Sequence, residues 1–436
     1  MIDSLRDRFD KAAEIAKRHN KVHLFSHYDA DGICSTSVVA SALRREGIDY
    51  DFTIFPTLGE EQMEVVRNTD FECMIMTDMG TSFLEELGAL GKDCIVLDHH
   101  EPLTDTDLAH VAYVNCHNAG IDGSHEVCAS TMAYLFAQSM GDNKDLIEIA
   151  IGGMIGDKQH IGGFKGVNKG IIDEAVFDGR IIVKERSLIP PGDLRTQLYE
   201  SIDPFIKGVS GDKEGIEALL ESLGIDDEPD VERMEALESR LIQMLRVQGT
   251  SEPIIDECTS IRYYLPSFGM DAERMSTIAD SCGRSGKELY GIGFCMDHGN
   301  PDAERACSEQ MERTMVCARS VTPESVVTMG NLQYFTNGVH GITGTMASIQ
   351  SKYLGIPTLP VIGFCIEGDM ADISSRCTNL ALSLGINMAT VMKECSRSVG
   401  GNGGGHANAA GGRIPADRIE EFVHLADRMI FEQKKL

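Results

Sequence analysis

Four short segments in the first part of the chain carry acids and histidines at spacings that suit metal ions. The segment SHYDADG places His27, Asp29 and Asp31 at alternate positions. In an extended chain these three side chains point the same way. Three later segments, TDMG, LDHHEP and MIGDK, supply Asp78, Asp98, His99, His100 and Asp157. Taken alone, the DxD segment is more typical of a solvated turn or a helix cap, the histidine pair can be an exposed surface pair, and Asp157 is more typical of a turn at a helix end. A mixture of carboxylates and imidazoles suits Mn²⁺ better than Mg²⁺ or Ca²⁺.

Three of these four segments directly follow an apolar run that we predict to be a β-strand. The predicted strands cover residues 22–26, 73–77 and 94–97, and helical patterns alternate with them. Buried strands that alternate with helices indicate a parallel α/β sheet. The carboxyl ends of parallel strands meet at one edge of the sheet, where the ligand crevice lies. We therefore expect side chains from distant parts of the chain to meet there.

In this order, the four segments resemble the signature motifs of the DHH phosphoesterase superfamily. That superfamily includes RecJ exonucleases, nanoRNases, cyclic-dinucleotide phosphodiesterases and family II inorganic pyrophosphatases. The resemblance covers about residues 20–160. It implies two Mn²⁺ ions, with Mg²⁺ as the alternative, and Asp78 as the ligand that bridges them. The other implied ligands are Asp29 and His27 for one ion, and Asp31, His99 and Asp157 for the second.

The same resemblance implies roles for two further residues of LDHHEP. His100 would face the phosphate or the leaving oxygen, and Asp98 would orient a histidine from behind. His27 departs from the pattern of many members, which carry a histidine where Phe25 stands here. This departure favours a RecJ-like over a pyrophosphatase-like arrangement.

A second set of residues near the C-terminus suits phosphate binding. The segments DISSR and GGNGGGH contain Ser375, Arg376, Gly404, Gly405 and His406. Arginine pairs with phosphate through two parallel hydrogen bonds, and glycine lets backbone N–H groups approach an anion closely. The alternatives are an ordinary surface arginine and a flexible loop. Together the segments resemble the DHH-associated C-terminal domain, which implies that these residues bind a nucleotide across a cleft from the metals and that Arg376 assists catalysis.

We therefore predict an α/β protein with three parts. Residues 1–160 would form a parallel-sheet DHH catalytic domain, 161–255 a helical connector, and 256–436 a smaller α/β DHH-associated domain that binds substrate. Within the last part, ELYGIGFCM is predicted to contain a strand and GGNGGGH to be a loop.

The bulk composition limits the class of protein. The formal net charge of −29 argues against indiscriminate binding to nucleic acid or to an anionic membrane, although it leaves room for a local basic groove. Thirteen cysteines without a CxxC pair argue against a disulfide framework and against a structural zinc site. The first residues indicate a charged amphipathic helix rather than a signal peptide, so we expect a cytoplasmic protein without a membrane partner.

The function that these patterns favour is a Mn²⁺-dependent exonuclease that releases mononucleotides from single-stranded DNA or RNA. One alternative is a phosphodiesterase for short oligonucleotides or cyclic dinucleotides, which the acidity favours. The other alternative is a replisome scaffold without enzymatic activity, and the intact motif acids argue against it. The overall plan also resembles the archaeal RecJ-like proteins, which implies a partner of the GINS replication complex. Homo-oligomerisation stays open.

Overall fold

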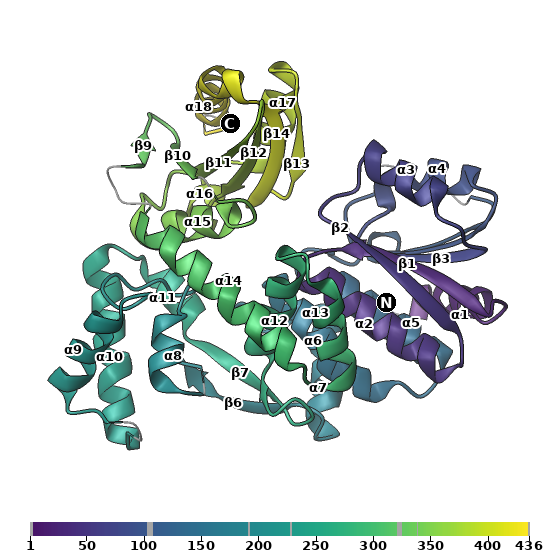
Figure 1. The fold of residues 1–436 in the computed structure, drawn as a ribbon, viewed down its shortest axis with the longest axis horizontal. Coiled ribbons are helices and arrows are strands. Elements are labelled where there is room, and N and C mark those ends of the chain that lie inside the picture. Colours follow the sequence, from purple (N-terminus) through teal and green to yellow (C-terminus); the bar gives the residue numbers. More distant parts are fainter. Residues whose placement is uncertain are drawn as a thin grey trace. The chain divides into compact units, whose positions relative to one another are not determined.

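In the computed structural model of this chain, the described residues are 3–102, 108–190, 192–226, 229–320, 325–337 and 339–434. They divide into two compact units (Figure 1). Unit 1 comprises residues 1–186 and 260–310, and unit 2 comprises residues 187–259 and 311–436.

Unit 1 is built around a parallel sheet with the strand order β2-β1-β3-β4-β5. Its strands are β1 (Lys21–His27), β2 (Asp49–Phe55), β3 (Cys73–Thr77), β4 (Asp93–Asp98) and β5 (Val111–Asn115). The helices that connect and flank them are α1 (Asp3–Ala16), α2 (Ala30–Arg45), α3 (Glu60–Asn68), α4 (Leu84–Ala89), α5 (Ala129–Met140), α6 (Ile147–Gly156) and α7 (Gly166–Phe177). The strand order reverses between β1 and β3, which is where ligands bind in open α/β sheets.

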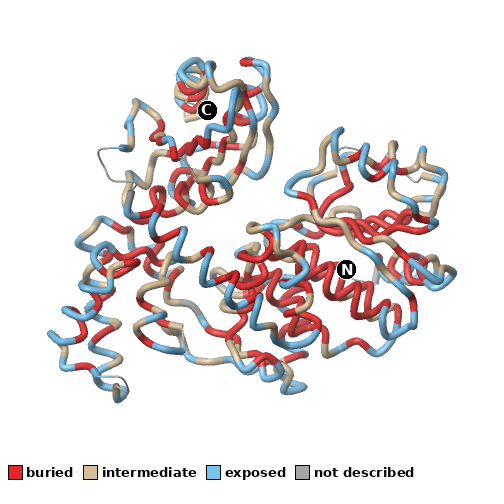
Figure 2. Tube along the Cα trace, in the orientation of Figure 1, coloured by how far each residue is buried: buried red, intermediate tan, exposed pale blue. Residues whose placement is uncertain are grey.

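The two faces of this sheet bury different sets of side chains. On one face, Phe25 and Met76 pack with Met63 and Leu87 of α3 and α4. The other face is covered by α2, in which every residue from Ala30 to Leu43 is buried. Figure 2 shows this burial along the strands and along α2. The N-terminal end of α2 is therefore fixed at the carboxyl edge of the sheet.

The remaining elements of unit 1 come from the middle of the chain. They are β6 (Ile182–Ser187), β7 (Ser260–Leu265), β8 (Met270–Asp271), α12 (Ala272–Arg284), α13 (Glu288–Asp297) and the start of α14 (Pro301–Ser320). Strands β6, β7 and β8 form a small sheet. Residues 260–310 group with the N-terminal part because α12 packs on α2 and α6, where Met275 lies against Gly152. Each unit is thus built from two separate stretches of the chain.

The predicted strand in ELYGIGFCM is wrong, because this segment forms the helix α13. Gly291 lies so close to α12 that an added Cβ would come within 2.8 Å of Cys282. Ile292 and Cys295 are also buried. A short apolar run is compatible with either a buried strand or a buried helix, so its pattern alone could not distinguish them.

Unit 2 contains a six-stranded sheet with the order β13-β14-β12-β11-β10-β9. Only β10 and β11 are parallel; the other neighbouring pairs are antiparallel. The strands are β9 (Val327–Thr328), β10 (Gln333–Asn337), β11 (Val361–Glu367), β12 (Met370–Arg376), β13 (Asn402–Gly405) and β14 (Ala409–Pro415). The helices are α8 (Leu194–Tyr199), α9 (Lys213–Leu223), α10 (Val231–Gln248), α11 (Glu252–Cys258), the end of α14, α15 (Thr343–Ile349), α16 (Asn379–Ser383), α17 (Met388–Ser398) and α18 (Ile419–Gln433).

The glycine-rich segment of unit 2 is largely strand rather than loop, which corrects the prediction. Gly404 pairs with Gly411, and Gly405 pairs with Ala410. The glycines allow α17 to pack closely on this hairpin, because a Cβ at Gly403 would lie 2.7 Å from the carbonyl oxygen of Met392. A high glycine content is typical both of flexible loops and of strands that pack closely on a neighbouring backbone, so it could not distinguish them.

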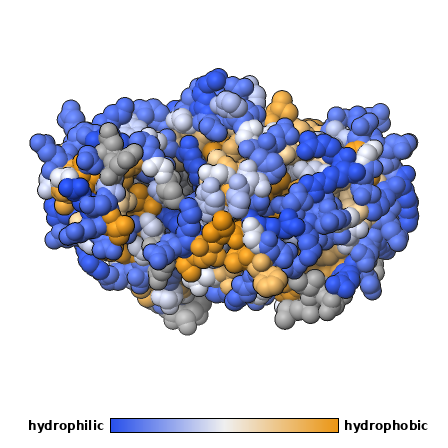
Figure 3. Space-filling model, turned by 90° about the horizontal axis from the view of Figure 1, so that it is seen from below, coloured by the Kyte–Doolittle hydropathy of each residue, from blue (hydrophilic) through white to orange (hydrophobic). Residues whose placement is uncertain are grey.

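The face of the molecule drawn in Figure 3 is mostly hydrophilic, with smaller hydrophobic areas between. Every one of the thirteen cysteines is a buried, free thiol. Within the described part of the chain, no helix combines the length and the apolar character that crossing a membrane would need.

Candidate metal centre

The turn from β1 into α2 presents the first ligands. Asp29 is the N-cap of α2, and its Oδ1 accepts a hydrogen bond from the backbone N–H of Gly32 at 3.1 Å. A Cβ at Gly32 would lie 2.1 Å from the carbonyl oxygen of His27, so only glycine fits this turn. Asp31 follows in the first helical turn and is buried. The SHYDADG spacing is therefore a helix start that brings its acids to the sheet edge.

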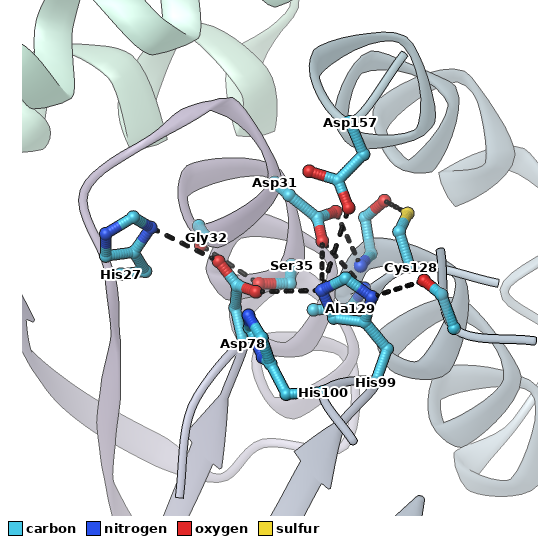
Figure 4. Close-up of polar contacts among 12 residues, drawn as sticks. His27, Asp31, Gly32, Ser35, Asp78, His99, His100, Cys128, Ala129 and Asp157 are labelled. Carbon is cyan, nitrogen blue, oxygen red and sulfur yellow. Dashed lines mark hydrogen bonds and ion pairs between the residues drawn. The ribbon is translucent and has the colours of Figure 1, made fainter. Parts of the chain in front are cut away.

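Asp78 occupies the centre of the cluster (Figure 4). It follows β3 with a φ of 59°, a left-handed conformation that aspartate tolerates better than most residues. Its Oδ2 lies 3.4 Å from His27 Nδ1, whereas its Oδ1 lies 3.3 Å from His99 Nε2. The two oxygens of one carboxylate thus face two different groups of side chains.

The first group contains His27, Asp29 and Asp78, whose ligand atoms all lie within 4.8 Å of one another. His27 Nδ1 lies 3.0 Å from Asp29 Oδ2. The opposite ring nitrogen, Nε2, lies 3.1 Å from the carbonyl oxygen of Pro56 and can donate to it. This contact leaves Nδ1 directed at the two carboxylates, as a metal-binding imidazole requires.

The second group is arranged around His99 at the end of β4. Its Nδ1 lies 2.7 Å from the carbonyl oxygen of Gly123, to which it can donate. Its Nε2 faces the carboxylates of Asp157 at 3.6 Å and Asp31 at 4.0 Å, in addition to Asp78. A backbone partner for one ring nitrogen fixes the other as the ligand atom.

The N-terminus of α5 holds the carboxylate of Asp31. Asp31 Oδ2 accepts from the N–H of Ala129 at 2.7 Å, and Oδ1 accepts from the N–H of Ser130 at 2.8 Å. Free N–H groups and the dipole at a helix start favour an anion. A Cβ at Gly153 would lie 2.3 Å from Asp31 Oδ1, so α6 also approaches this carboxylate closely.

Asp98 supports the adjacent histidine from beneath the site. Its Oδ1 lies 2.7 Å from His100 Nδ1 and accepts the N–H of His99 at 2.8 Å. Its Oδ2 accepts from the N–H of Thr81 at 3.0 Å. Asp98 is buried, whereas 42% of the His100 side chain is exposed. The outer edge of the His100 ring is therefore accessible while its inner edge is held.

Burial and mutual repulsion shift the pKa values of the clustered groups. Burial, with repulsion from Asp78, raises the pKa of Asp31 to about 6. Burial and the charge of Asp31 raise the pKa of Asp157 well above its usual range. For His99, burial alone lowers the pKa, but Asp78 and Asp157 raise it well above the ordinary value. The clustered groups therefore keep protons at a higher pH than usual, because protonation reduces the repulsion between the carboxylates. A bound divalent cation would reduce the same repulsion without the protons.

The donor set fits divalent ions. Two groups of carboxylates and imidazoles share Asp78, and each imidazole has its second nitrogen engaged by a backbone carbonyl. Two ions bridged by one carboxylate are held in this way in two-metal hydrolases. All six predicted ligands, together with Asp98 and His100, are brought together by the structure.

Three residues at this site were not predicted from the sequence: Cys128, Tyr28 and Arg284. Cys128 lies with Asp31 and Asp157 in a third group of ligand-type atoms. Arg284, at the end of α12, donates from Nη1 to the Tyr28 hydroxyl at 3.2 Å and lies over the Tyr28 ring. Although burial raises the pKa of Asp29, His27 and Arg284 hold it well below its usual range. Arg284 is far from the motifs in sequence, so no local pattern could reveal it.

The predicted phosphate-binding residues all lie in unit 2, at one end of its sheet. Arg376 ends β12 opposite Ala409, and Arg376 Nη1 donates to the carbonyl oxygen of Ser375 at 2.8 Å. The backbone N–H of His406 donates to the carbonyl oxygen of Ala409 at 2.8 Å. The hydroxyl of Ser375 is fully buried and donates to the carbonyl oxygen of Ala410, so it serves the sheet. Arg376 is half-buried and His406 is exposed.

Comparison with protein families and curated proteins identifies relatives of both units. The N-terminal domain of the DHH family matches residues 21–155, and the DHHA1 domain matches residues 331–432. An uncharacterized protein of Methanocaldococcus jannaschii is 28% identical over 431 residues, which are 96% of this chain and 95% of that protein. The single-stranded-DNA-specific exonuclease RecJ of Bacillus subtilis is 28% identical over 107 residues, which are 22% of this chain and 14% of RecJ.

Solved structures share the fold. RecJ from Thermus thermophilus in complex with Mn²⁺ matches with a TM-score of 0.58 at 15% identity, over 98% of this chain and 55% of that chain. CDC45 from Entamoeba histolytica matches with a TM-score of 0.60 at 12% identity, over 99% of this chain and 98% of that chain. This chain thus spans about half the length of the Thermus protein. With DHH and DHHA1 domains in this order, and with RecJ among its relatives, the chain belongs to the DHH phosphoesterase superfamily as a RecJ-like protein.

Proposed function

We propose that this DHH phosphoesterase is a Mn²⁺-dependent exonuclease that releases mononucleotides from single-stranded nucleic acid. The observation that carries the proposal is the position of Asp78, whose two oxygens face His27 on one side and His99 on the other. Ligands from four separated segments meet around this carboxylate. A two-metal centre would explain why so many acids are buried together.

In the proposed mechanism, this chain's residues hold the ions and position the phosphodiester. His27, Asp29 and Asp78 would hold one ion, and the ligands of the second would be Asp31, Asp78, His99 and Asp157. When bound, such ions activate water as the nucleophile and stabilise charge on phosphoryl oxygens. His100, held by Asp98, keeps an accessible ring edge that can donate to a phosphate oxygen or to the leaving oxygen.

The residues of unit 2 would bind the nucleotide. The guanidinium of Arg376 matches a phosphate, and the exposed ring of His406 offers a second donor beside the glycine hairpin. In unit 1, Arg284 adds a cation beside Asp29. Each unit thus has local cations that can contact phosphate groups despite the net charge of −29.

Long single strands are the favoured substrate because the curated RecJ relative is specific for single-stranded DNA. Short oligonucleotides or cyclic dinucleotides are the second candidate, which the strongly acidic composition favours. A scaffold in a replication complex, with a GINS-type partner, is the third candidate, and the fold shared with CDC45 is compatible with it. The presence of every motif acid favours an enzyme over a scaffold alone.

The direct test is an assay with end-labelled DNA and RNA strands and with dinucleotides, in Mn²⁺ and in Mg²⁺. We expect Mn²⁺-dependent shortening of the long strands to mononucleotides, and a loss of activity of about 10³-fold or more in the Asp78→Asn variant. Cleavage of dinucleotides alone would favour the second candidate. The absence of hydrolysis by the wild-type chain with either ion would contradict the enzymatic proposal.

A further inference from the structure

Unit 2 carries a separate cluster of metal-ligating side chains. The ligand atoms of His340, Cys365 and Glu367 all lie within 4.8 Å of one another. His340 Nδ1 is 3.2 Å from Glu367 Oε1 and 3.7 Å from Asp372 Oδ2. The His340 side chain is 66% exposed, so an ion in solution can reach the cluster.

The register of the sheet brings these side chains together. Cys365 and Glu367 alternate on β11 and therefore share one face. Asp372 on β12 lies directly opposite Cys365, and Asn337 on β10 lies directly opposite it from the other side. Residues directly opposite in neighbouring strands present their side chains on the same face. His340 follows shortly after β10 and completes the group.

The carboxylates of Glu367 and Asp372 lie close enough to the Cys365 thiol to act on it electrostatically. Asp372 directs Oδ1 towards Arg413 Nε at 3.6 Å, which leaves Oδ2 facing His340. Burial, with the charges of Glu367 and Asp372, raises the pKa of the Cys365 thiol. Asn337 is 8% exposed, and its Nδ2 has no hydrogen-bond partner among the described residues. A thiolate on the adjacent strand would provide an acceptor for that donor.

We propose that His340, Cys365 and Glu367 bind Zn²⁺, with Asp372 as the fourth ligand. Zinc favours a tetrahedral shell of nitrogen, sulfur and oxygen atoms, whose bond lengths of about 2.0–2.3 Å place neighbouring ligand atoms roughly 3.3–3.8 Å apart. The distances from His340 Nδ1 to Glu367 Oε1, 3.2 Å, and to Asp372 Oδ2, 3.7 Å, are close to that spacing. Binding forms a Zn–S bond and releases the thiol proton of Cys365 to solvent. The softer thiolate distinguishes this site from the carboxylate-rich centre of unit 1.

A zinc ion here would lie towards the turn of the β11–β12 hairpin, at the other end of these strands from Arg376. It would tie the segment that precedes α15 to the β11–β12 hairpin. In α15, a Cβ at Gly344 would lie 2.9 Å from Arg376 Nη2, so this helix packs directly on the arginine. The ion would thus stabilise the packing beside Arg376 without contacting the substrate.

The test uses the full-length chain, freed of metal with a chelator and titrated with Co²⁺ as a spectroscopic substitute for Zn²⁺. We expect a thiolate-to-cobalt charge-transfer band that Zn²⁺ abolishes by displacement. The band should be lost in Cys365→Ser and in His340→Gln, and each variant should retain one fewer equivalent of Zn²⁺ per chain. Because His340 is exposed, its substitution leaves the fold intact.

Two matched variants make the assignment specific. Cys377→Ser changes a cysteine just beyond β12, and Cys128→Ser changes the cysteine beside Asp31 and Asp157. Both should keep the band. Its absence in the wild-type chain, or its persistence in both Cys365→Ser and His340→Gln, would overturn the proposal. Loss of the band in Cys128→Ser alone would also overturn it, since the thiolate would then belong to unit 1.

Discussion

The two units assemble their clusters of ligand-type side chains in different ways. In unit 1, parallel strands end at one edge, and Asp78 and His99 each follow the end of a strand. In unit 2, antiparallel pairing aligns Cys365 with Asp372 across two strands. The first arrangement collects residues that are distant in sequence, whereas the second collects residues from one hairpin and the segment before it.

The surroundings of the two clusters differ as much as their topology. Asp31 and His99 are buried, and backbone groups hold each of them in place. At the second cluster, His340 and Glu367 are largely exposed. A site built from oriented, buried ligands suits catalysis, because its geometry is fixed before substrate arrives. A more exposed site on a hairpin suits a metal ion that stabilises the fold.

The largest effect is expected from Asp78→Asn. This change removes the charge shared by both ligand groups, so Mn²⁺-dependent hydrolysis should fall by about 10³-fold or more, the upper range for loss of one electrostatic group. The value of kcat/KM on an end-labelled strand measures the effect. The cobalt band assigned to Cys365 should be unchanged in this variant. Hydrolysis close to the wild-type rate would remove Asp78 from the centre of the mechanism.

A smaller loss is expected from Asp98→Asn. The amide cannot accept from the His100 ring and from three backbone N–H groups as the carboxylate does. We expect hydrolysis or Mn²⁺ affinity to fall by about 10–100-fold, as for other groups that orient ligands from behind.

Asp93→Asn is the matched control for that variant. Asp93 lies on the same strand, and its Oδ2 also contacts a histidine, His19 at 2.9 Å. Because this pair lies at the opposite end of β4, the substitution should leave kcat unchanged. Equal losses in the two variants would indicate a general effect on the strand rather than a role for Asp98.

Gly153→Ala tests how tightly the first cluster is packed. The added Cβ would lie 2.3 Å from both Asp31 Oδ1 and Ser130 Oγ. We expect the free energy of unfolding to fall by about 1–3 kcal/mol, as for other overpacked sites. Gly170→Ala in α7 meets nothing within 4 Å and is the control, which should be neutral or slightly stabilising. Urea denaturation of both variants measures the difference, and equal stabilities would show that α6 moves away at little cost.

The smallest effect is the pH dependence of Mn²⁺ stabilisation. In the metal-free chain, the raised pKa of Asp31 contributes stability that is present below its ordinary value of 3.8 and lost as the pH rises through about 6. Mn²⁺ replaces the proton, so the Tm gain on adding Mn²⁺ should increase above pH 6. The gain should be about 2–4 °C per kcal/mol of added binding. In Asp31→Asn the Tm gain should vary less with pH. If the gain varied with pH as it does in the wild-type chain, a group other than Asp31 would be responsible.

The sequence anticipated unit 1 more completely than unit 2, for a physical reason. In a parallel sheet every strand runs the same way, so residues after successive strands must reach the same edge. The prediction of an α/β fold with a parallel sheet is confirmed, and so is the resemblance to the DHH superfamily. The reversal of strand order between β1 and β3 could not be predicted, because strand order depends on long-range pairing.

The later segments were harder to predict, because their sequence patterns are each compatible with two kinds of secondary structure. Residues 402–405 are compatible with a loop or with closely packed strands, and packing against α17 decides for strands. The apolar run 288–296 forms a helix because a neighbouring helix covers it.

The sequence by itself determined the identity of the ligand-type residues in unit 1, their order and the edge at which they gather. Local rules suffice there, since strand direction and the helix start at Asp29 are encoded within a few residues. Only the tertiary structure decided that the oxygens of Asp78 divide between two groups, that Arg284 lies beside Asp29, and that Cys365 lies opposite Asp372. These features depend on register and on packing between distant segments, which no local pattern specifies.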